Sequence, residues 1–212
     1  MLPEIAILDP SLTLNLPKGI TAGTGMDALA HCIEAFSSPF YHPMAEGTAV
    51  EGLRLVKENI QEVYHNGSNI EARAHMLVAS MMGAAAFQKG LGAIHSITHP
   101  VNSLYHTHHG TTNGTVMPFV LNFNRSVIEK KFDRLAKFLN IPNGFEGLVN
   151  WIIELKKEME IPETLKDMGV NKGDEVKLAP LAQEDPSTGG NPLEMNENKF
   201  QELILNCIEG KY

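Results

Sequence analysis

The chain has 212 residues, of which 43% are hydrophobic and 20% are charged, a composition that can bury a globular core and excludes disorder and fibrous repeats. The formal net charge is −8, the wrong sign for nucleic-acid phosphates or anionic lipid, so we expect no nucleic-acid partner and no membrane partner. Two cysteines cannot build a disulfide framework, and the first residues lack the pattern of a signal peptide. We therefore expect a cytoplasmic protein.

Residues 1–22 predict a lead-in segment with one short strand remnant. Ile5–Leu8 has the composition of a strand, but it stands alone before Asp9-Pro10. A lone strand cannot complete its own hydrogen-bond ladder. We therefore expect a lead-in over 1–22 and one all-helical domain over 23–212.

Apolar residues three and four positions apart dominate the remainder and predict helices. In chain order, the predicted helices run from about Met26 to Phe36 with Thr24 as N-cap, from Pro43 to a stop at Asn66-Gly67, from an Asn69 cap to Gly90, from near Ala93 with either a kink or the end of its first part at Pro100, and over 128–139, 145–159 and 198–209. The third, apolar on most sides, is predicted to be central and buried. Residues 184–192 predict a loop. The expected fold class is an all-α helical bundle.

Residues Gly23–Ala28 formally fit the dinucleotide fingerprint G-x-G-x-x-G/A. That fingerprint binds pyrophosphate only when its glycines follow a strand directly and open a helix within a βαβ unit. About a dozen residues separate Ile5–Leu8 from Gly23, and no βαβ alternation follows. We interpret the glycines as part of an ordinary turn into a helix.

Two histidine clusters indicate a metal site. Asp27 and His31 are four residues apart, as are His95 and His99, so each pair shares one face of a helix. Further histidines follow at positions 106, 108 and 109. Imidazoles with one carboxylate form a mixed N/O donor set that suits Zn²⁺ or Fe²⁺ better than Ca²⁺ or Mg²⁺. Spacing alone does not say which histidines would bind the ion.

Other catalytic signatures are missing from the sequence. It contains no HExxH, no His-Asp dipeptide and no GxSxG motif, and only Glu62 to His65 has the ExxH spacing that a di-iron bundle needs twice. Neither cysteine lies in a local signature of a nucleophile. These observations argue against zincins, helical phosphohydrolases, ferritin-like proteins and serine hydrolases.

Three segments, in order and spacing, resemble those of one known family. Gly25–His31 (GMDALAH) is similar to G-x-D-A-L-x-H, Gly90–Pro100 (GLGAIHSITHP) to G-L-G-x-x-H-x-x-x-H-P, and His109–Pro118 to H-G-x-x-N-x-x-x-x-P. These are motifs of the iron-containing (group III) alcohol dehydrogenases. Asp9-Pro10 and residues 185–192 extend the resemblance over essentially the whole chain, but only over the C-terminal part of the family's length.

The resemblance implies a ligand set of Asp27, His31, His95 and His109 around Fe²⁺, Zn²⁺ or another divalent ion. It also implies that His99 lies in the catalytic pocket beside the nicotinamide site, as a catalytic and cofactor-binding residue. Histidines 106 and 108 are then expected in the loop or pocket wall, and histidines 42, 65 and 75 on helix surfaces.

The resemblance further implies a metal-dependent alcohol dehydrogenase that transfers hydride between a small alcohol or aldehyde and NAD or NADP. The family's N-terminal Rossmann-like domain, with its pyrophosphate loop, is absent from this sequence, so we expect little turnover from the isolated chain. The exposed face that such a domain covers leads us to expect a homo-oligomer. Two alternatives stay open: a non-catalytic helical metal-binding or interaction module, and a zinc-dependent polyol dehydrogenase relative.

Overall fold

The computed structural model describes residues 4–212, so the first three residues of the expected lead-in lie outside the described residues. The α-helices of that part of the chain are α1 (Lys18–Ser37), α2 (Pro43–His65), α3 (Ile70–Ala86), α4 (Ala93–Tyr105), α5 (His109–Phe138), α6 (Gly144–Glu158), α7 (Glu175–Glu184) and α8 (Glu197–Glu209). Short 3₁₀ helices η1 (Pro10–Thr13), η2 (Phe87–Lys89), η3 (Lys166–Met168) and η4 (Pro186–Gly190) connect them. Residues 4–212 contain no strand, which confirms the predicted all-α bundle.

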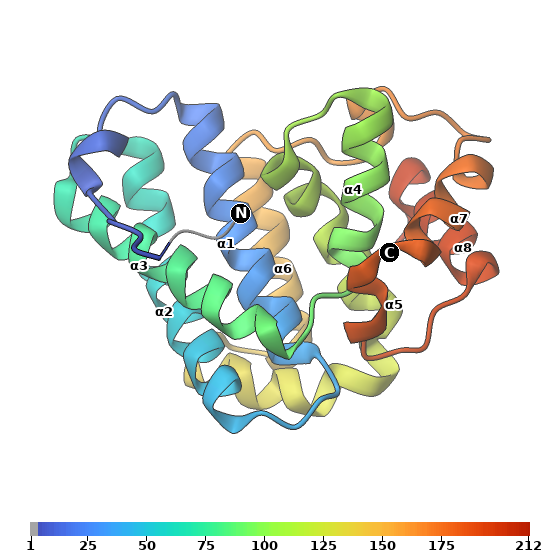
Figure 1. Ribbon diagram of the computed structural model, residues 1–212, viewed down its shortest axis with the longest axis horizontal. Helices are drawn as coiled ribbons and strands as arrows, with labels where there is room; N and C mark the ends of the chain where they lie inside the picture. The colour runs from blue at the N-terminus through green and yellow to red at the C-terminus, as the bar shows by residue number, and fades with distance from the viewer. Residues whose placement is uncertain (1–3) are drawn as a thin grey trace.

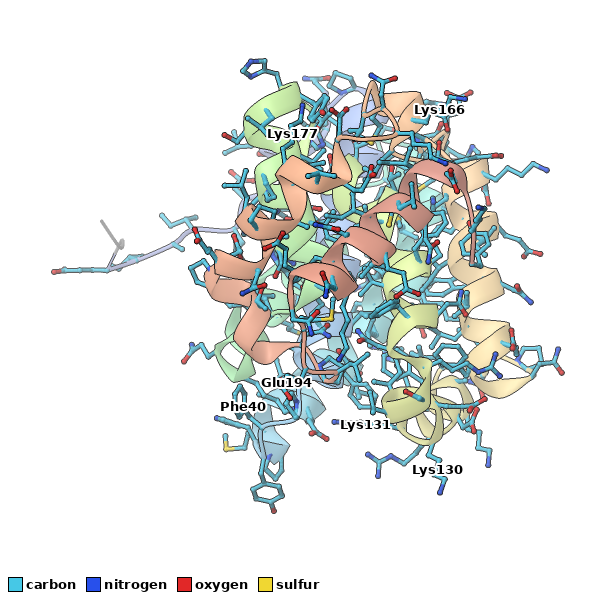
Figure 2. All side chains as sticks on the ribbon, turned by 90° about the vertical axis from the view of Figure 1, so that its right-hand side faces the viewer. Phe40, Lys130, Lys131, Lys166, Lys177 and Glu194 are labelled. Atoms are coloured by element: carbon cyan, nitrogen blue, oxygen red, sulfur yellow. The ribbon has the colours of Figure 1, made fainter. Side chains whose placement is uncertain are left out.

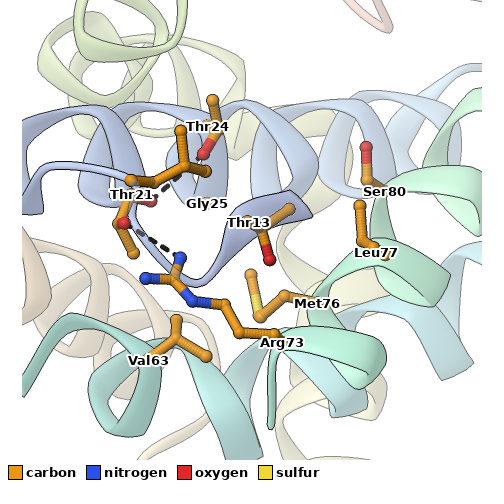
Figure 3. Close-up of a pocket in the computed structure, with 10 residues that line it drawn as sticks. Thr13, Thr21, Thr24, Gly25, Val63, Arg73, Met76, Leu77 and Ser80 are labelled. Atoms are coloured by element: carbon orange, nitrogen blue, oxygen red, sulfur yellow. Dashed lines mark hydrogen bonds between the residues drawn. The ribbon is translucent and has the colours of Figure 1, made fainter. Parts of the chain in front are cut away.

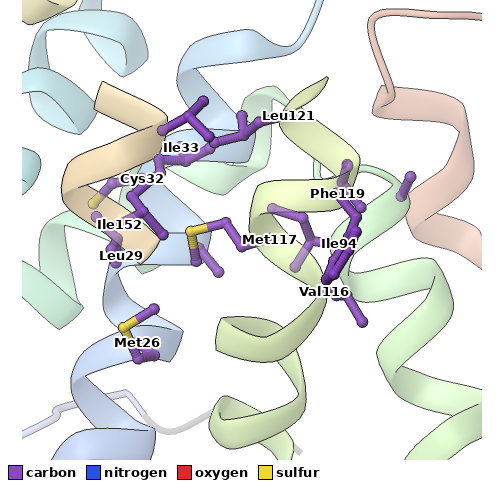
Figure 4. Packing of buried hydrophobic residues seen from close by; sticks show 14 of the residues in the cluster. Met26, Leu29, Cys32, Ile33, Ile94, Val116, Met117, Phe119, Leu121 and Ile152 are labelled. Carbon is purple, nitrogen blue, oxygen red and sulfur yellow. The ribbon is translucent and has the colours of Figure 1, made fainter. Parts of the chain in front are cut away.

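Helix α1 runs through the middle of the bundle, with α2 and α3 on one side and α4, α7 and α8 on the other (Figure 1). It packs against α2, α3 and α5, while α5 also packs against α4 and α6. The core around these contacts contains Met26 and Ile33 of α1, Met117 and Leu121 of α5, and Ile152 of α6 (Figure 4). Helices far apart in sequence therefore meet along one central helix.

Most charged side chains lie on the surface, although Glu34, Arg73, Lys89 and Lys156 are buried. Lysines such as Lys130, Lys166 and Lys177 are exposed and project from the outside of the bundle (Figure 2). Among the described residues, no single helix has the length and apolarity to cross a membrane. Only together are the segments Ile70–Lys89 and Ala93–Tyr105 long and apolar enough for a span, and the chain bends by 108° between them.

The N-terminal part differs from the prediction in two ways. Helix α1 begins at Lys18 rather than near Met26, so the boundary drawn between residues 22 and 23 falls inside it. Thr24 is no N-cap, because its hydroxyl donates 2.8 Å to the carbonyl of Ile20 within the helix. The short strand predicted over Ile5–Leu8 is absent from the structure. Ile5 and Ile7 are 80% and 86% exposed, and a strand without a partner has no ladder to join.

Helix α3 is not the central buried helix that its composition predicts. Its buried residues include Ala72, Ala79 and Gly83, whereas Ile70 and Met81 are 51% and 48% exposed. Small residues allow the close approach to α1 and α2, while Met76 and Met82 are only partly buried against the core. The Asn69 cap was predicted correctly, since its Oδ1 accepts from the Ala72 amide at 3.1 Å.

The structure contains more helix than the sequence predicts, in α5 and in α7. Residues 128–139 form only the second half of α5, which runs for 30 residues and includes Pro118. The α7 segment, Glu175–Glu184, was not predicted as a helix. Helix α4 continues through Pro100 to Tyr105, and the predicted loop over 184–192 contains the 3₁₀ helix η4. The histidine-, threonine- and asparagine-rich start of α5 has little apolar periodicity, which explains why the pattern hid it.

Candidate metal centre

Three helices bring the predicted site residues together. Asp27 and His31 project from α1, His95 and His99 from α4, and His109 from the first turn of α5. The His95 ring stacks on the His31 ring, with centroids 4.8 Å apart. The His95 and His109 centroids are 5.3 Å apart, and those of His99 and His109 are 5.5 Å apart. Residues separated by up to 82 positions therefore share one cluster.

Asp27 lies at the centre of the donor atoms. Its Oδ1 is 3.8 Å from His31 Nε2, 3.8 Å from His95 Nε2 and 3.2 Å from His109 Nε2. One donor atom each from Asp27, His31 and His95 forms a compact set with all separations within 4.8 Å. His109 joins this set through Asp27. Which of these atoms bind a metal stays a prediction.

The donor set fits a small divalent cation. Ligand atoms about 2.1 Å from one tetrahedral ion stand ~3.4 Å from one another, close to the separations around Asp27. The Nδ2 of Asn113 lies 2.7 Å from Asp27 Oδ1 and 3.2 Å from both His95 Nε2 and His109 Nε2. Two amide hydrogens cannot serve three acceptors, so the site has more lone pairs than donors. Such a surplus is what a cation satisfies.

Glu34, on the same face of α1, lies behind His95 and was not predicted. It is 3% exposed, and its Oε2 is 2.6 Å from His95 Nδ1. Its Oε1 accepts 2.7 Å from the Ile94 amide in the first turn of α4. A carboxylate on one ring nitrogen fixes the tautomer and leaves the other nitrogen free as a ligand. Asn102 lies against His109 with the opposite polarity: its Nδ2 donates to His109 Nδ1 at 3.2 Å, while its Oδ1 accepts from the Thr107 and Thr112 hydroxyls.

His99 differs from the other histidines of the cluster. Its side chain is 42% exposed, and its Nδ1 lies 2.7 Å from Asp185 Oδ2, so its partner is a carboxylate near the C-terminus of the chain. Burial raises the pKa of Asp185, but hydrogen bonds from the Ser187 amide and from His99 have the opposite and larger effect. The pKa of Asp185 is therefore lower than usual. The carboxylate thus stays ionised and orients the ring, with Nε2 on the free side.

Burial and charge act in opposite directions on the ionisable groups of the cluster. Burial raises the pKa of Asp27, but hydrogen bonds from His109 and His95 lower it well below the usual range. Burial lowers the pKa of His31, only partly offset by Asp27. Burial also lowers the pKa of His95, but the Glu34 and Asp27 carboxylates outweigh it and raise the pKa to about 9. The two carboxylates thus give the site a strong preference for positive charge.

The C-terminal segment holds α4 in place. Asn191 Oδ1 accepts 3.2 Å from the Ala93 amide, and the Asn191 and Asn124 side-chain amides pair at 2.9 Å in both directions. Thr188 donates 2.8 Å to the Ser96 hydroxyl. The residues from 185 to 192 therefore fix the helix that carries both His95 and His99, and they also supply Asp185.

The other histidines lie apart from the cluster's donor atoms. His42 and His108 act as N-caps of α2 and α5, and His106 ends α4 in a left-handed conformation. His65 pairs with Glu158 at 2.6 Å on the surface, and His75 lies 3.2 Å from Asn59. Each of these five therefore has a role in local structure.

The glycine turn predicted over Gly23–Ala28 is wrong, because these residues lie inside α1. A Cβ at Gly25 would lie 2.8 Å from Ile60 Cδ1, and one at Gly23 would lie 2.5 Å from the His108 ring. These glycines permit neighbouring side chains to approach the helix closely.

Comparisons with known proteins give the family. Residues 21–208 match the family model described as "Fe-containing alcohol dehydrogenase family, C-terminal". A 4-hydroxybutyrate dehydrogenase from Cupriavidus necator is 38% identical, with 96% of this chain and 56% of that protein covered. An NAD-dependent methanol dehydrogenase from Bacillus methanolicus is 34% identical, with 97% of this chain and 56% of that protein covered. The crystal structure of a 1,3-propanediol oxidoreductase matches with a TM-score of 0.93 at 32% identity, covering 98% of this chain and 56% of that one.

The chain thus spans about half the length of the curated relatives it matches. The matching half contains the GMDALAH and GLGAIHSITHP segments that bring the clustered aspartate and histidines together. The fold, the motifs and the matched range agree, and the chain belongs to the iron-containing alcohol dehydrogenase family, of which it represents the C-terminal, helical part.

Proposed function

We propose that this chain supplies the metal-binding part of an alcohol dehydrogenase that acts on a small alcohol or aldehyde with NAD or NADP, and that the enzyme works in the cytoplasm as a homo-oligomer. The observation that supports this most directly is the convergence of His31, His95 and His109 on one Asp27 oxygen, at 3.2–3.8 Å. The dehydrogenase relatives support the reaction class.

Asp27, His31, His95 and His109 would hold the divalent ion, Fe²⁺ or Zn²⁺. When bound, the ion supplies Lewis acidity that makes a hydroxyl proton easier to lose, and the nicotinamide supplies the hydride acceptor. An ion that accepts more than four ligands would keep room beside these three imidazoles and one carboxylate for a substrate oxygen. Glu34 and Asn102 hold the rings of His95 and His109 so that each Nε2 faces the site.

His99 would move the proton. Asp185 binds its Nδ1, so the tautomer with a proton on Nδ1 leaves Nε2 as the acceptor. The ring stacks on His109 at 5.5 Å and is partly open to solvent, so a proton taken up on the cluster side can leave to water. The residue therefore has both access to the site and an exit for the proton.

Metal analysis of two variants tests these roles. His95→Ala should sharply reduce bound metal after purification without added metal, because losing one of four ligands also disorganises the others. His99→Ala should keep the metal. In a version extended by the family's cofactor-binding domain, His99→Ala should lower turnover by ~10²-fold, the scale of a lost proton-transfer group. The assignment is wrong if His99→Ala empties the site while His95→Ala does not.

A non-catalytic metal-binding module is the second candidate, because the compact donor set of Asp27, His31 and His95 could hold an ion without any reaction. The extended version separates the two. Alcohol-dependent NAD(P) reduction that disappears in the His95→Ala variant supports the enzyme, whereas metal binding without turnover supports the module. For the 212-residue chain alone we expect metal binding with little turnover, because nicotinamide has to be held for hydride transfer.

A further inference from the structure

A cavity of about 250 Å³ lies between η1, the first half of α1, the end of α2 and α3. None of the clustered aspartate and histidine residues lines it. Its lining contains one ionisable side chain, Arg73, together with polar Thr13, Thr21, Thr24 and Ser80 and an apolar remainder. The cavity is therefore separate from the metal centre and has a chemistry of its own.

Arg73 is buried without an anion. It is 5% exposed, its Nε donates 3.0 Å to the Gly67 carbonyl, and its Nη1 donates 3.0 Å to the Thr21 hydroxyl. These bonds use two of the five N–H donors of a guanidinium. Within residues 4–212 no carboxylate pairs with it, and burial alone lowers the pKa of Arg73. A buried cation of this kind is costly unless an anion compensates it.

The remaining lining is amphipathic. Figure 3 shows the guanidinium beside Thr21, with Met76 and Leu77 of α3 along the same cavity and Val63 below it. Ser80 adds a hydroxyl at the far side of Leu77. A ligand that fits this lining carries a planar anionic group at one end and an alkyl group at the other.

We propose that this cavity binds a short-chain aliphatic monocarboxylate, with its carboxylate on Arg73 and its alkyl chain against Val63 and Leu77. A carboxylate matches the guanidinium fork and pairs with it by charge-assisted hydrogen bonds. The volume lies below the ~300–1,000 Å³ of sites for drug-sized molecules, so the ligand is small. A phosphate fits less well, because its oxygens point in all directions and the apolar wall offers them no donors.

Binding of hexanoate to the 212-residue chain, labelled with ¹³C at its methionine methyl groups, tests the proposal. The Met76 methyl, which lines the cavity, should shift saturably, while the Met117 methyl in the core should not. n-Hexanol should bind at least ~10-fold more weakly, because a neutral hydroxyl loses the charge-assisted bonds. Inorganic phosphate should not displace hexanoate. The proposal is overturned by an unresponsive Met76, by equal affinity for hexanol, or by displacement with phosphate.

Variants sharpen the test. Arg73→Met should weaken hexanoate at least ~10-fold. Arg54→Met is the matched control, since Arg54 pairs with Glu51 and Glu58 on the outside of α2, and it should bind hexanoate like the wild type. If Arg73→Met fails to fold, Ser80→Leu narrows the cavity from a solvent-exposed position on α3 and should abolish the saturable Met76 shift. Unchanged hexanoate affinity in a folded Arg73→Met or Ser80→Leu variant contradicts the proposal.

Discussion

Helix α4 buries polar side chains, with His95 1% and Ser96 0% exposed, whereas α3 leaves Met81 48% and Val78 36% exposed. Two of the three buried polar side chains of α4 have a partner from another element, Glu34 for His95 and Thr188 for Ser96, whereas the buried Thr98 hydroxyl has none in the described part of the chain. On α3 the buried residues are small except for Arg73, so the helix approaches its neighbours closely and leaves Val78 and Met81 on the outside. In these two helices, a side chain is buried when it faces a neighbouring element, whether it is polar or apolar.

The largest effect should come from the contact between α1 and α5 beside the site. A Cβ at Gly110 would lie 2.0 Å from the Gly23 carbonyl oxygen, a backbone atom that cannot rotate away. We expect Gly110→Ala to cost about 3 kcal/mol of unfolding free energy or to prevent folding, measured by urea denaturation.

Gly47→Ala is the matched control for Gly110→Ala. Gly47 lies within α2 with nothing within 4 Å of an added Cβ, so this change should stabilise by ~0.5–1 kcal/mol. Wild-type stability in the Gly110→Ala variant would show that α1 and α5 do not approach so closely.

The next effect concerns the partner of His95. Glu34→Gln keeps the size of the side chain and an oxygen for the Ile94 amide, but it removes the charge that faces His95 Nδ1. We expect the affinity for the divalent ion to fall ~10–100-fold, as for other partners of metal ligands. Chelator competition measures it, and Glu51→Gln on the surface of α2 serves as the control. An unchanged metal Kd would mean that Glu34 only supports the start of α4.

The sequence predicts much of the bundle because local signals coincide with the elements. Asn69 and Pro43 mark the true starts of α3 and α2, and helical spacing places Asp27 and His31 on one face. The start of α1 was misplaced because Thr24 resembles a cap but bonds back along its own helix. The burial of α3 was misjudged because composition does not reveal which face meets a neighbour.

At the site, residues close in sequence could be predicted from their spacing, whereas contacts between distant segments could not. Glu34 is seven residues after Asp27 and three after His31. This spacing places all three on one helix face and could have indicated Glu34 as a site residue. Asp185 offers no such signal, because it reaches His99 across 86 positions through the path of α7 and η4. Only the family resemblance, not spacing, separated His95 from His99 as the expected ligand.

A smaller effect tests the two faces of α3. Ala79 is 0% exposed against α1 and α2, so Ala79→Leu overpacks the interface and should cost about 1–3 kcal/mol. Met81→Ser changes an exposed apolar side chain two positions later and should alter stability by less than ~0.5 kcal/mol. Thermal or urea unfolding of the pair measures the difference. Equal costs would contradict the assignment of inner and outer faces.

The smallest effect compares how α3 and α4 begin. Asn69 caps α3 locally, while α4 begins at Gly92 without a side-chain cap of its own and takes its acceptors from Glu34 and Asn191. Asn69→Ala should therefore lower the free energy of unfolding by ~1 kcal/mol, and Asn69→Ser, which keeps a cap acceptor without placing a second carboxylate beside Glu62, should recover most of it.

The metal Kd should be the same in both Asn69 variants, because the cap acts within α3 and its α2 neighbour Glu62, far along the chain from the clustered histidines. The start of α4, in contrast, shares Glu34 with His95, so disturbing it changes the metal site directly. If Asn69→Ala weakens metal binding as much as it weakens folding, α3 and the metal centre open together. The contrast between a locally capped outer helix and an inner helix held by its neighbours would then have to be abandoned.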